Sequence, residues 1–229
     1  MKAMILAAGM GKRMRPLTLI TPKPLLEIAG VPLIEYHVRR LVAAGFSDIV
    51  VNHAWLGDQI EAYLGDGRRF GANIVFSREA EPLETAGGIR KALPLLESKD
   101  ETSFILVNGD VFTDFPYSSL NQLADKSPYL VLVPNPAHNP EGDFCLNEGR
   151  LYADRGEKYT FSGVSVLPLE MFADLVEGEV TALGPILREA IVKGEARGAV
   201  YDGFWADVGT PERLRQIDYL VQEQKIDGF

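Results

Sequence analysis

Cysteine and histidine are scarce in this sequence. Its 229 residues include a single cysteine, Cys145, and three histidines. One cysteine excludes any disulfide within the chain, which suits a reducing compartment, so we expect a cytoplasmic protein. His37, His53 and His138 stand far apart with no ligand spacing, and we assign chemistry to none of them.

Positive charge and long apolar runs are lacking as well. The formal net charge is -9, whereas nucleic acids and anionic membranes bind broad basic surfaces, so we expect neither as a partner. No apolar run approaches the length of a transmembrane helix, and no signal-peptide cleavage site follows the first residues. The composition is that of a soluble globular protein, and the length fits one domain over residues 1–229.

A glycine-rich stretch near the start is the most informative part of the chain. The apolar run at residues 3–8 has the length of a buried parallel strand, and it breaks at Gly9 and Gly11. Glycines at a strand end let backbone N–H groups converge on an anion. Three cations crowd the following positions: Lys12, Arg13 and Arg15.

This stretch predicts a cradle for a triphosphate. Arginine presents bidentate donors that suit phosphate oxygens. We therefore expect Arg13 to bind the β- and γ-phosphates. The assisting groups would be the side chain of Lys12 and the backbone of Gly9, Met10 and Gly11.

Two familiar phosphate motifs are absent. A dinucleotide-binding fold has a third glycine where this chain has Met14, and an acidic residue ends its second strand, where this chain has Asn52. A Walker loop needs Gly-Lys-Ser/Thr after four intervening residues, and the sequence contains none. The glycine loop is therefore of another kind.

Strand and helix patterns alternate along the chain and predict an α/β fold. We expect a three-layer, Rossmann-like sheet, mixed but mostly parallel, with helices on both faces. In such sheets ligands bind beyond the carboxyl ends of the strands, where the loop at Gly9, the segment 79–88 and the turn at Asn108 fall. Strands are expected at 3–8, 48–51, 73–77, 104–107, 130–133, 143–147, 159–167 and 199–201, and helices at 32–44, 55–64, 85–96, 169–175, 186–193 and 211–224.

Four motifs resemble those of the sugar-1-phosphate nucleotidylyltransferases, in that family's order and across nearly the whole chain. They are Leu6-Ala-Ala-Gly-Met-Gly-Lys-Arg-Met-Arg-Pro16, Thr21-Pro-Lys-Pro-Leu25, Asn108-Gly-Asp110 and Trp205-Ala-Asp-Val-Gly-Thr210. The resemblance implies a GT-A-like nucleotidyltransferase fold and Mg²⁺-dependent transfer of a nucleotidyl group to a sugar 1-phosphate. Within one domain it implies a nucleotide-binding half at residues 1–110 and a sugar-phosphate-binding half at 111–229.

Three further stretches, 52–57, 81–85 and 142–144, are similar to family members that use UTP and N-acetylmuramic acid α-1-phosphate in peptidoglycan recycling. Other substrate pairs stay open: mannose 1-phosphate with GTP, or glucose 1-phosphate with UTP or dTTP. A nucleotide-sensing subunit without turnover is a further alternative, which the intact motifs disfavour. Longer family members assemble through a left-handed β-helix for which this chain has no room, so it is expected to be a monomer or a small homo-oligomer.

Carboxylates at strand ends are the expected ligands of Mg²⁺. This ion binds through one or two carboxylates, together with waters and phosphate oxygens. Asp110 follows a buried strand, and Asp207 lies in a second strand-end turn before Gly209. The alternative for both is a turn aspartate that bonds its own backbone.

Lysines and an acidic turn are the candidates for the sugar phosphate. The prolines beside Lys23 hold it on a stiff segment, and the resemblance makes it the bridge between the nucleotide α-phosphate and the sugar phosphate. Many family members carry a second lysine, but here Lys158 is followed by a tyrosine and a shorter connection, so either lysine is open for the role. Sugar recognition is expected from Asn108, which could also bond the ribose, and from Asp143 with the backbone of Gly142; the alternative for Asp143 is a solvated strand end.

The resemblance also marks residues for the base. Family members read it with backbone near Ala8, and Glu79 matches a base-contacting glutamine of related uridylyltransferases. A carboxylate there would suit uracil or guanine. Gly87 and Gly88 open a helix and either admit a base or sugar closely or merely pack.

Overall fold

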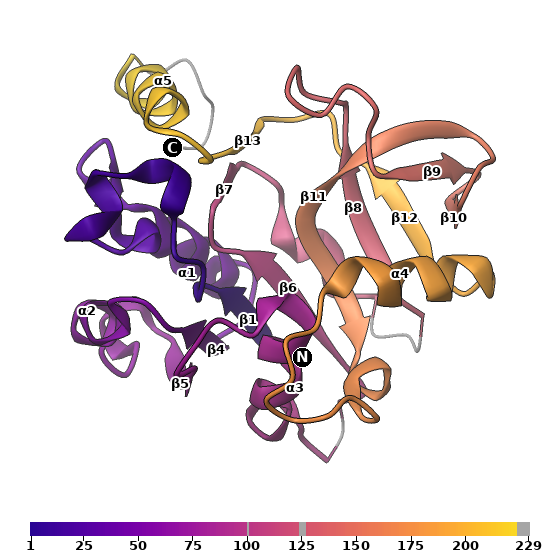
Figure 1. Cartoon of the computed structure of the whole chain (residues 1–229), viewed down its shortest axis with the longest axis horizontal. Helices are drawn as coiled ribbons and strands as arrows, with labels where there is room; N and C mark the ends of the chain where they lie inside the picture. Colours follow the sequence, from indigo (N-terminus) through magenta and orange to yellow (C-terminus); the bar gives the residue numbers. More distant parts are fainter. Residues whose placement is uncertain (100, 124–126, 224–229) are drawn as a thin grey trace.

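The computed structural model describes residues 1–99, 101–123 and 127–223. Within these residues nine strands form one sheet in the order β5-β4-β1-β6-β11-β8-β12-β10-β9 (Figure 1). Strands from the first half of the chain, up to β6, and from the second half, from β8 onward, therefore share one sheet. Their bounds are β1 Ala3–Leu6, β4 Asp48–His53, β5 Asn73–Arg78, β6 Ser103–Asn108, β8 Tyr129–Val133, β9 Phe144–Asn147, β10 Arg150–Tyr152, β11 Glu157–Pro168 and β12 Arg197–Val200.

The sheet is mixed, and its parallel part carries the start of the chain. β1 pairs in parallel with β4 and β6, so that Leu6 lies beside both Asn52 and Asn108. β5 continues the parallel order beyond β4. β11 then pairs antiparallel with β6, β8 and β9, while β12 runs parallel to β8. The long strand β11 thereby joins the two parts.

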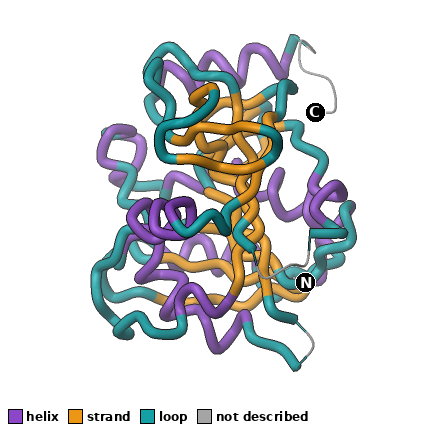
Figure 2. The backbone as a smooth tube through the Cα atoms, turned by 90° about the vertical axis from the view of Figure 1, so that its right-hand side faces the viewer, coloured by secondary structure: helices purple, strands orange, loops and turns teal. Residues whose placement is uncertain are grey.

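Helices cover both faces of the sheet, as Figure 2 shows. α1 (Leu33–Ala43) and α2 (Gly57–Leu64) pack on one face, and α3 (Glu84–Leu96) and α4 (Leu183–Val192) pack on the other. Successive side chains of a strand point to opposite faces. Accordingly Ile5 enters the first core and Met4 the second, which explains why β1 is apolar throughout.

A third core lies beside the sheet and seats the last helix, α5 (Pro211–Gln222). The Thr210 hydroxyl caps this helix by accepting from the Arg213 N–H. The Ala29 N–H donates to Asp218 Oδ1 at 2.7 Å, and Figure 1 shows α5 next to the N-terminal turns. The buried members are Met14, Leu26, Ile28, Leu33, Phe112, Val208, Ile217 and Val221.

Several elements differ from the sequence-based expectation. The helix expected at 169–175 is a 3₁₀ turn, Leu169–Phe172, because Phe172 alone is deeply buried there and one anchor does not sustain an amphipathic helix. The expected end of the last helix at residue 224 lies outside the described residues. Five strands of two or three residues were not expected. They are β10, described above, and β2 (Glu27–Ile28), β3 (Val31–Pro32), β7 (Val111–Thr113) and β13 (Trp205–Asp207).

Among the described helices, none has the length and apolar character that crossing a membrane requires. The chain's one cysteine, Cys145, is a buried free thiol. Besides the nine-stranded sheet, β2 pairs with β3 and β7 pairs with β13 in two small antiparallel ribbons.

Met14→Ala should destabilise the fold, because Met14 is 1% exposed within the third core. We expect the free energy of unfolding to fall by about 2–5 kcal/mol, the usual cost of such a cavity. Urea titration followed by circular dichroism measures it. Leu19→Ala is the control, since Leu19 is 50% exposed and should cost under about 0.5 kcal/mol. Equal midpoints for the two variants would contradict the packing assigned to Met14.

Candidate active site

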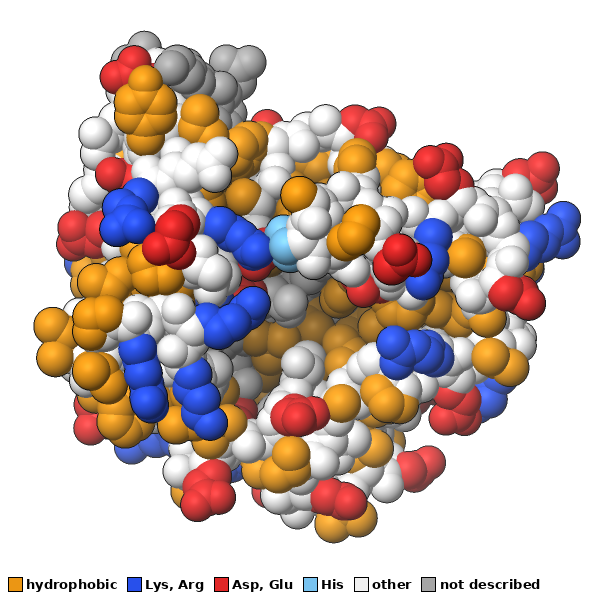
Figure 3. Space-filling model, turned by 45° about the horizontal axis from the view of Figure 1, so that its top comes forward, with side chains coloured by type: hydrophobic (Ala, Val, Ile, Leu, Met, Phe, Trp, Pro, Cys, Tyr) orange, Lys and Arg blue, Asp and Glu red, His pale blue; other side chains and the backbone are white. Residues whose placement is uncertain are grey.

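A pocket of about 550 Å³ opens at the carboxyl ends of β1, β4 and β6. Figure 3 shows a hollow between the two parts of the molecule, with Lys and Arg side chains along its rim. The pocket lies at the sheet edge that the sequence predicted. Its lining residues are Leu6, Ala7, Ala8, Gly9, Met10, Gly11, Lys12, Arg13, Met14, Lys23, Pro24, Asn52, Pro82, Glu84, Thr85, Asn108, Gly109, Asp110 and Gly209.

The glycine loop is anchored at one end and open at the other. Gly11 has a φ of +59°, and a Cβ there would lie 2.8 Å from Thr18 Cγ2, so glycine is required twice over. Its carbonyl accepts from the Thr18 hydroxyl and from the Met14 N–H, both at 2.8 Å. At Gly9 a Cβ would meet no protein atom within 4 Å. The backbone at Gly9 therefore borders space that a ligand can occupy.

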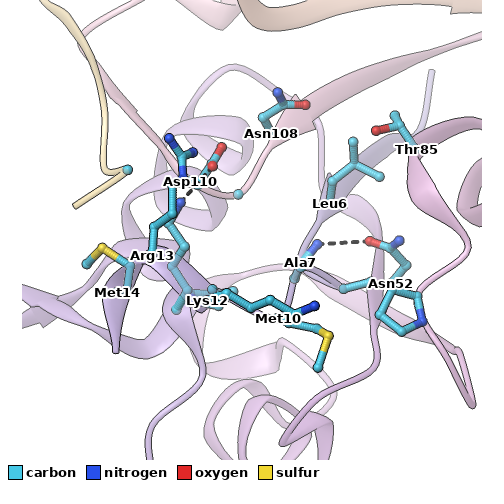
Figure 4. A pocket seen from close by; sticks show the side chains of 18 of the residues that line it. Leu6, Ala7, Met10, Lys12, Arg13, Met14, Asn52, Thr85, Asn108 and Asp110 are labelled. Atoms are coloured by element: carbon cyan, nitrogen blue, oxygen red, sulfur yellow. Dashed lines mark hydrogen bonds and ion pairs between the residues drawn. The ribbon is translucent and has the colours of Figure 1, made fainter. Parts of the chain in front are cut away.

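Cations and a carboxylate share one wall of the pocket. Lys12, Arg13 and Lys23 all line it, and Figure 4 shows Arg13 and Asp110 on one side with Asn52 and Thr85 on the other. Lys23 lies in the 3₁₀ turn Lys23–Leu25 and is only 11% exposed. Its Nζ donates to Asp110 Oδ2 at 2.7 Å, and the Asp110 side chain is 40% exposed. The wall thus carries an excess of positive charge with one accessible carboxylate.

Asp207 reaches the same region on the β7–β13 ribbon. The ribbon continues past the paired strands, where the Val208 N–H donates to the Asp110 carbonyl at 2.7 Å. The Asp207 carboxylate accepts from Arg213, and His138 Nε2 lies 2.8 Å from its Oδ1 without hydrogen-bond alignment. Asp207 itself does not line the pocket. A backbone hydrogen bond thus links the segments that carry the two aspartates. Their carboxylates have different partners: Lys23 for Asp110, and Arg213 and His138 for Asp207.

The two carboxylates fit Mg²⁺ unequally. Mg²⁺ prefers hard oxygen donors and uses one or two carboxylates. Asp110 offers an accessible carboxylate in the pocket, whereas Asp207 would have to give up its contacts with Arg213 and His138. Over the described part of the chain there is no group of three or more His, Cys, Asp or Glu side chains suited to a metal. Asp110 is therefore the better-placed ligand.

Asn108 is held at the end of β6 by close backbone packing. Gly163 in β11 has a φ of +80°, and a Cβ there would lie 2.7 Å from Asn108 Nδ2. The register of β11 against β8 shifts at this point, and Trp205 Nε1 donates to the Ser162 carbonyl at 2.8 Å. At Gly109 a Cβ would lie 2.4 Å from the Leu6 carbonyl oxygen. Glycines on either side of Asn108 therefore fix where its amide lies.

Glu79, predicted to contact the base, does not line the pocket. It is 6% exposed, and both carboxylate oxygens accept hydrogen bonds inside the protein. Oε1 accepts from Asn52 Nδ2 at 2.7 Å and Oε2 accepts from the Leu83 N–H at 3.0 Å. The segment reaches the pocket, as the sequence predicted, but the Glu79 side chain is buried among protein donors. The segment lines the pocket through Pro82, Glu84 and Thr85 instead.

Gly87 and Gly88 are buried in α3 and pack against protein. A Cβ at Gly87 would lie 2.4 Å from the Glu179 carbonyl oxygen, and one at Gly88 would lie 2.8 Å from both Asn52 Nδ2 and Glu79 Oε1. Neither glycine lines the pocket. Of the two alternatives that the sequence left open for them, the structure shows the packing one.

Gly142, Asp143 and Lys158 are likewise not brought to the pocket lining. Asp143 Oδ2 accepts from the Phe161 N–H at 2.8 Å, which ties the start of β9 to β11. Gly142 has a φ of +62° in the preceding turn. Lys158 is exposed on β11, where it pairs with Cys145. These residues lie in the antiparallel part of the sheet.

Sequence reasoning missed Asn52, which is 2% exposed and lines the pocket. Its Oδ1 accepts from the Ala7 N–H at 2.9 Å (Figure 4). A signal was present, because Asn52 lies level with Leu6 near the end of β4 on one side of β1, as Asn108 does at the end of β6 on the other. Other lining residues that were not predicted are Leu6, Ala7, Met14, Pro24, Pro82, Glu84, Thr85, Gly109 and Gly209.

His37 is buried beneath this region and is neutral at pH 7. Burial lowers the pKa of His37 to about 4, although the nearby Asp110 acts in the opposite direction. Its Nδ1 lies 3.1 Å from the Tyr117 hydroxyl, and burial raises the pKa of Tyr117. Both side chains are therefore uncharged at physiological pH and act in packing.

Known proteins match nearly all of the chain. The sequence profile of the nucleotidyl transferase family matches residues 2–144, which include the glycine loop, Lys23 and Asp110. An N-acetylmuramate alpha-1-phosphate uridylyltransferase of Neisseria meningitidis is 50% identical over 96% of this chain and 98% of its own length. A mannose-1-phosphate guanyltransferase of Gibberella zeae is 34% identical over 93% of this chain, which spans 62% of that protein.

Solved structures share the fold. A putative glucose-1-phosphate thymidylyltransferase from Bacillus anthracis superposes with a TM-score of 0.83 at 19% identity, covering 97% of this chain and 95% of that one. HddC from Yersinia pseudotuberculosis, complexed with GMP-PN, gives 0.78 at 21% identity, with coverages of 96% and 99%. The family profile, the full-length relative and the shared fold agree. The chain belongs to the nucleotidyl transferase family and is a nucleotidyltransferase.

Proposed function

We propose that this protein transfers the uridylyl group of UTP to N-acetylmuramic acid α-1-phosphate, giving UDP-N-acetylmuramic acid and pyrophosphate. The 50% identity to the Neisseria meningitidis uridylyltransferase across 96% of the chain carries the choice of substrates. The meeting of a glycine loop with the Lys23–Asp110 pair in one pocket supports the chemistry. We assign the reaction to peptidoglycan recycling in the cytoplasm, where the free thiol of Cys145 would stay reduced.

Positioning and charge neutralisation supply the catalysis. An oxygen of the sugar phosphate attacks the α-phosphorus in line and pyrophosphate leaves, a reaction that asks for little covalent chemistry from the protein. The backbone N–H groups of the glycine loop, with Lys12 and Arg13, bind the β- and γ-phosphates. Lys23 offsets the charge of the two phosphates that must approach each other. Its low exposure strengthens this effect, because burial lowers the local dielectric.

Mg²⁺ would be held by Asp110, with Asp207 as a second carboxylate. When bound, the ion neutralises charge on phosphate oxygens. In the protein alone, Lys23 already neutralises Asp110 at 2.7 Å. Arg213 neutralises Asp207 in the same way. These contacts keep both carboxylates oriented before substrates bind.

We propose that residues 1–110 of this single domain bind the nucleotide and residues 111–229 the sugar phosphate. Support for the first half comes from the pocket lining, which it dominates. The backbone near Ala8 is the candidate for the base. Asn108 lines the pocket and Asp143 does not, so Asn108 is the stronger candidate for the sugar or the ribose.

The second candidate function is transfer of a guanylyl group from GTP to mannose 1-phosphate. It is favoured by relatives such as the Gibberella zeae guanyltransferase, 34% identical over 93% of the chain. This chain spans 62% of that protein. The fold and the pocket are compatible with both candidates, so only a substrate comparison separates them.

Pyrophosphate release with Mg²⁺ should be fastest for UTP with N-acetylmuramic acid 1-phosphate. The panel contains N-acetylglucosamine, glucose and mannose 1-phosphates, and GTP, dTTP, CTP and ATP as the other nucleotides. A preference for mannose 1-phosphate with GTP would establish the second candidate instead. Binding of UTP without pyrophosphate release on any sugar phosphate would favour a nucleotide-sensing subunit.

Lys23→Ala should lower kcat by about 100-fold or more, because the approaching phosphates lose a preorganised positive charge. Lys158→Ala is the matched control. Lys158 is exposed and outside the pocket lining, so its loss should leave kcat unchanged. Initial rates at saturating substrates measure both variants. The reverse result would transfer the sugar-phosphate role to Lys158.

Asp110→Asn should abolish turnover at any Mg²⁺ concentration, because it removes the accessible carboxylate while keeping the shape of the side chain. Asp207→Asn should lose less activity but melt at a lower temperature, since Arg213 and His138 lose their partner. Initial rates across a Mg²⁺ titration and thermal melts of each variant test whether Asp110→Asn loses more activity than Asp207→Asn. Activity of Asp110→Asn equal to wild type would exclude Asp110 as the metal ligand.

A further inference from the structure

A buried carboxylate next to the pocket is fully committed to hydrogen bonds within the protein. Glu79 is 6% exposed, and its Oε1 and Oε2 accept from Asn52 Nδ2 at 2.7 Å and from the Leu83 N–H at 3.0 Å. Buried carboxylates are rare unless such donors hold them. Each oxygen accepts a hydrogen bond from the protein, and Glu79 is absent from the pocket lining, so the geometry points to a role other than direct contact with a ligand.

Asn52 continues the chain of hydrogen bonds toward the glycine loop. Its Oδ1 accepts from the Ala7 N–H at 2.9 Å (Figure 4). A backbone N–H can only donate, so Ala7 fixes which end of the amide faces it. Nδ2 then faces Glu79 and donates. The direction of every bond from Ala7 to Leu83 follows from the two backbone N–H groups at the ends.

This series of four residues, Ala7, Asn52, Glu79 and Leu83, is called the relay below. It joins two walls of the pocket. Ala7 opens the glycine loop directly after β1, and Leu83 lies between the lining residues Pro82 and Glu84. Because Glu79 receives a donor from each side while Asn52 donates, a carboxylate serves both donors with one oxygen each, whereas a glutamine would face one of them with its NH₂ group.

The structure leaves no slack around the relay. A Cβ at Gly88 would lie 2.8 Å from Asn52 Nδ2 and from Glu79 Oε1. The Glu79 N–H donates to the His53 carbonyl at 2.8 Å, which fixes the Glu79 backbone beside the end of β4. A shift of either side chain would therefore move a wall of the pocket.

We propose that Glu79 and Asn52 are positioning residues that fix the distance between the glycine loop and the wall at residues 82–85, and so set the affinity for the nucleotide. The inference builds on the proposed function, since it concerns the UTP site of that reaction. Neither side chain needs to touch the reacting phosphates. The relay acts by holding the two walls at the spacing that the nucleotide requires.

Exchanging the carboxylate of Glu79 and the amide of Asn52, singly and together, tests the relay. In Glu79→Gln one of the two donors that face position 79 loses its acceptor, and in Asn52→Asp two carboxylates face each other. Each single change should raise the Kd and the KM for UTP by about tenfold or more, with a smaller effect on kcat. The double variant restores every bond, because glutamine accepts from Leu83 and donates to the new carboxylate, which accepts from Ala7. Its Kd and KM should return toward wild type.

Asn73→Asp is the matched control. Asn73 Nδ2 donates to Asp48 Oδ1 at 2.9 Å at the opposite ends of the same strands, β4 and β5, and the pair is exposed. The same like-charge change there should leave UTP binding unaffected. Thermal melts of all variants identify any that fail to fold; if a single variant does not fold, the Kd for UTP of the double variant decides, and a value near that of the wild type supports the relay.

Equilibrium dialysis with UTP, without any sugar phosphate, separates this inference from the proposed reaction. If the wild type binds UTP but is inactive on N-acetylmuramic acid 1-phosphate, the proposed reaction fails and the relay is judged on the Kd values. If UTP does not bind, GTP, dTTP, CTP and ATP replace it in the same comparison. A double variant no better than the weaker single one overturns the relay, as does a Glu79→Gln protein that melts lower but binds the nucleotide as wild type does.

Discussion

The parallel register of β4, β1 and β6 is the constraint on which the rest of the site depends. Leu6 lies beside both Asn52 and Asn108, so β1 loses both of its ladder partners at one level, where β6 also ends and β4 continues for only one more residue. Buried backbone groups need new partners. The Ala7 N–H donates to Asn52 Oδ1, and the Leu6 carbonyl accepts from the Gly109 N–H, both at 2.9 Å. The glycine loop and the turn to Asp110 begin at these points.

A second requirement is a support for the cationic wall, which the sheet itself does not provide. Arg13 and Met14 share one 3₁₀ turn, so burial of Met14 in the third core fixes the direction of its neighbour. Leu26 and Ile28 enter the same core and hold the segment that carries Lys23. Packing of α5 and electrostatics in the pocket are therefore linked through residues adjacent in sequence.

Apolar runs and glycine positions were enough to predict the sheet edge and the pocket, because both signals are local. The β7–β13 ribbon was not predictable in this way, since three-residue strands show no periodicity and their partners are distant in sequence. The burial of Glu79 depends on donors from Asn52 and Leu83, which meet only after folding. Asp207 was assigned from its turn, but its pairing with Arg213 depends on how α5 begins.

The third core has a consequence for biosynthesis. Met14 comes from the start of the chain, whereas Ile217 and Val221 come from α5, which the ribosome makes after every strand of the sheet. Contacts of such high sequence separation form late and slow folding. A nascent chain can therefore assemble β1, β4 and β6 while Met14 still lacks its cover. Affinity for the nucleotide should then arise only after α5 has been synthesised and has packed over Met14.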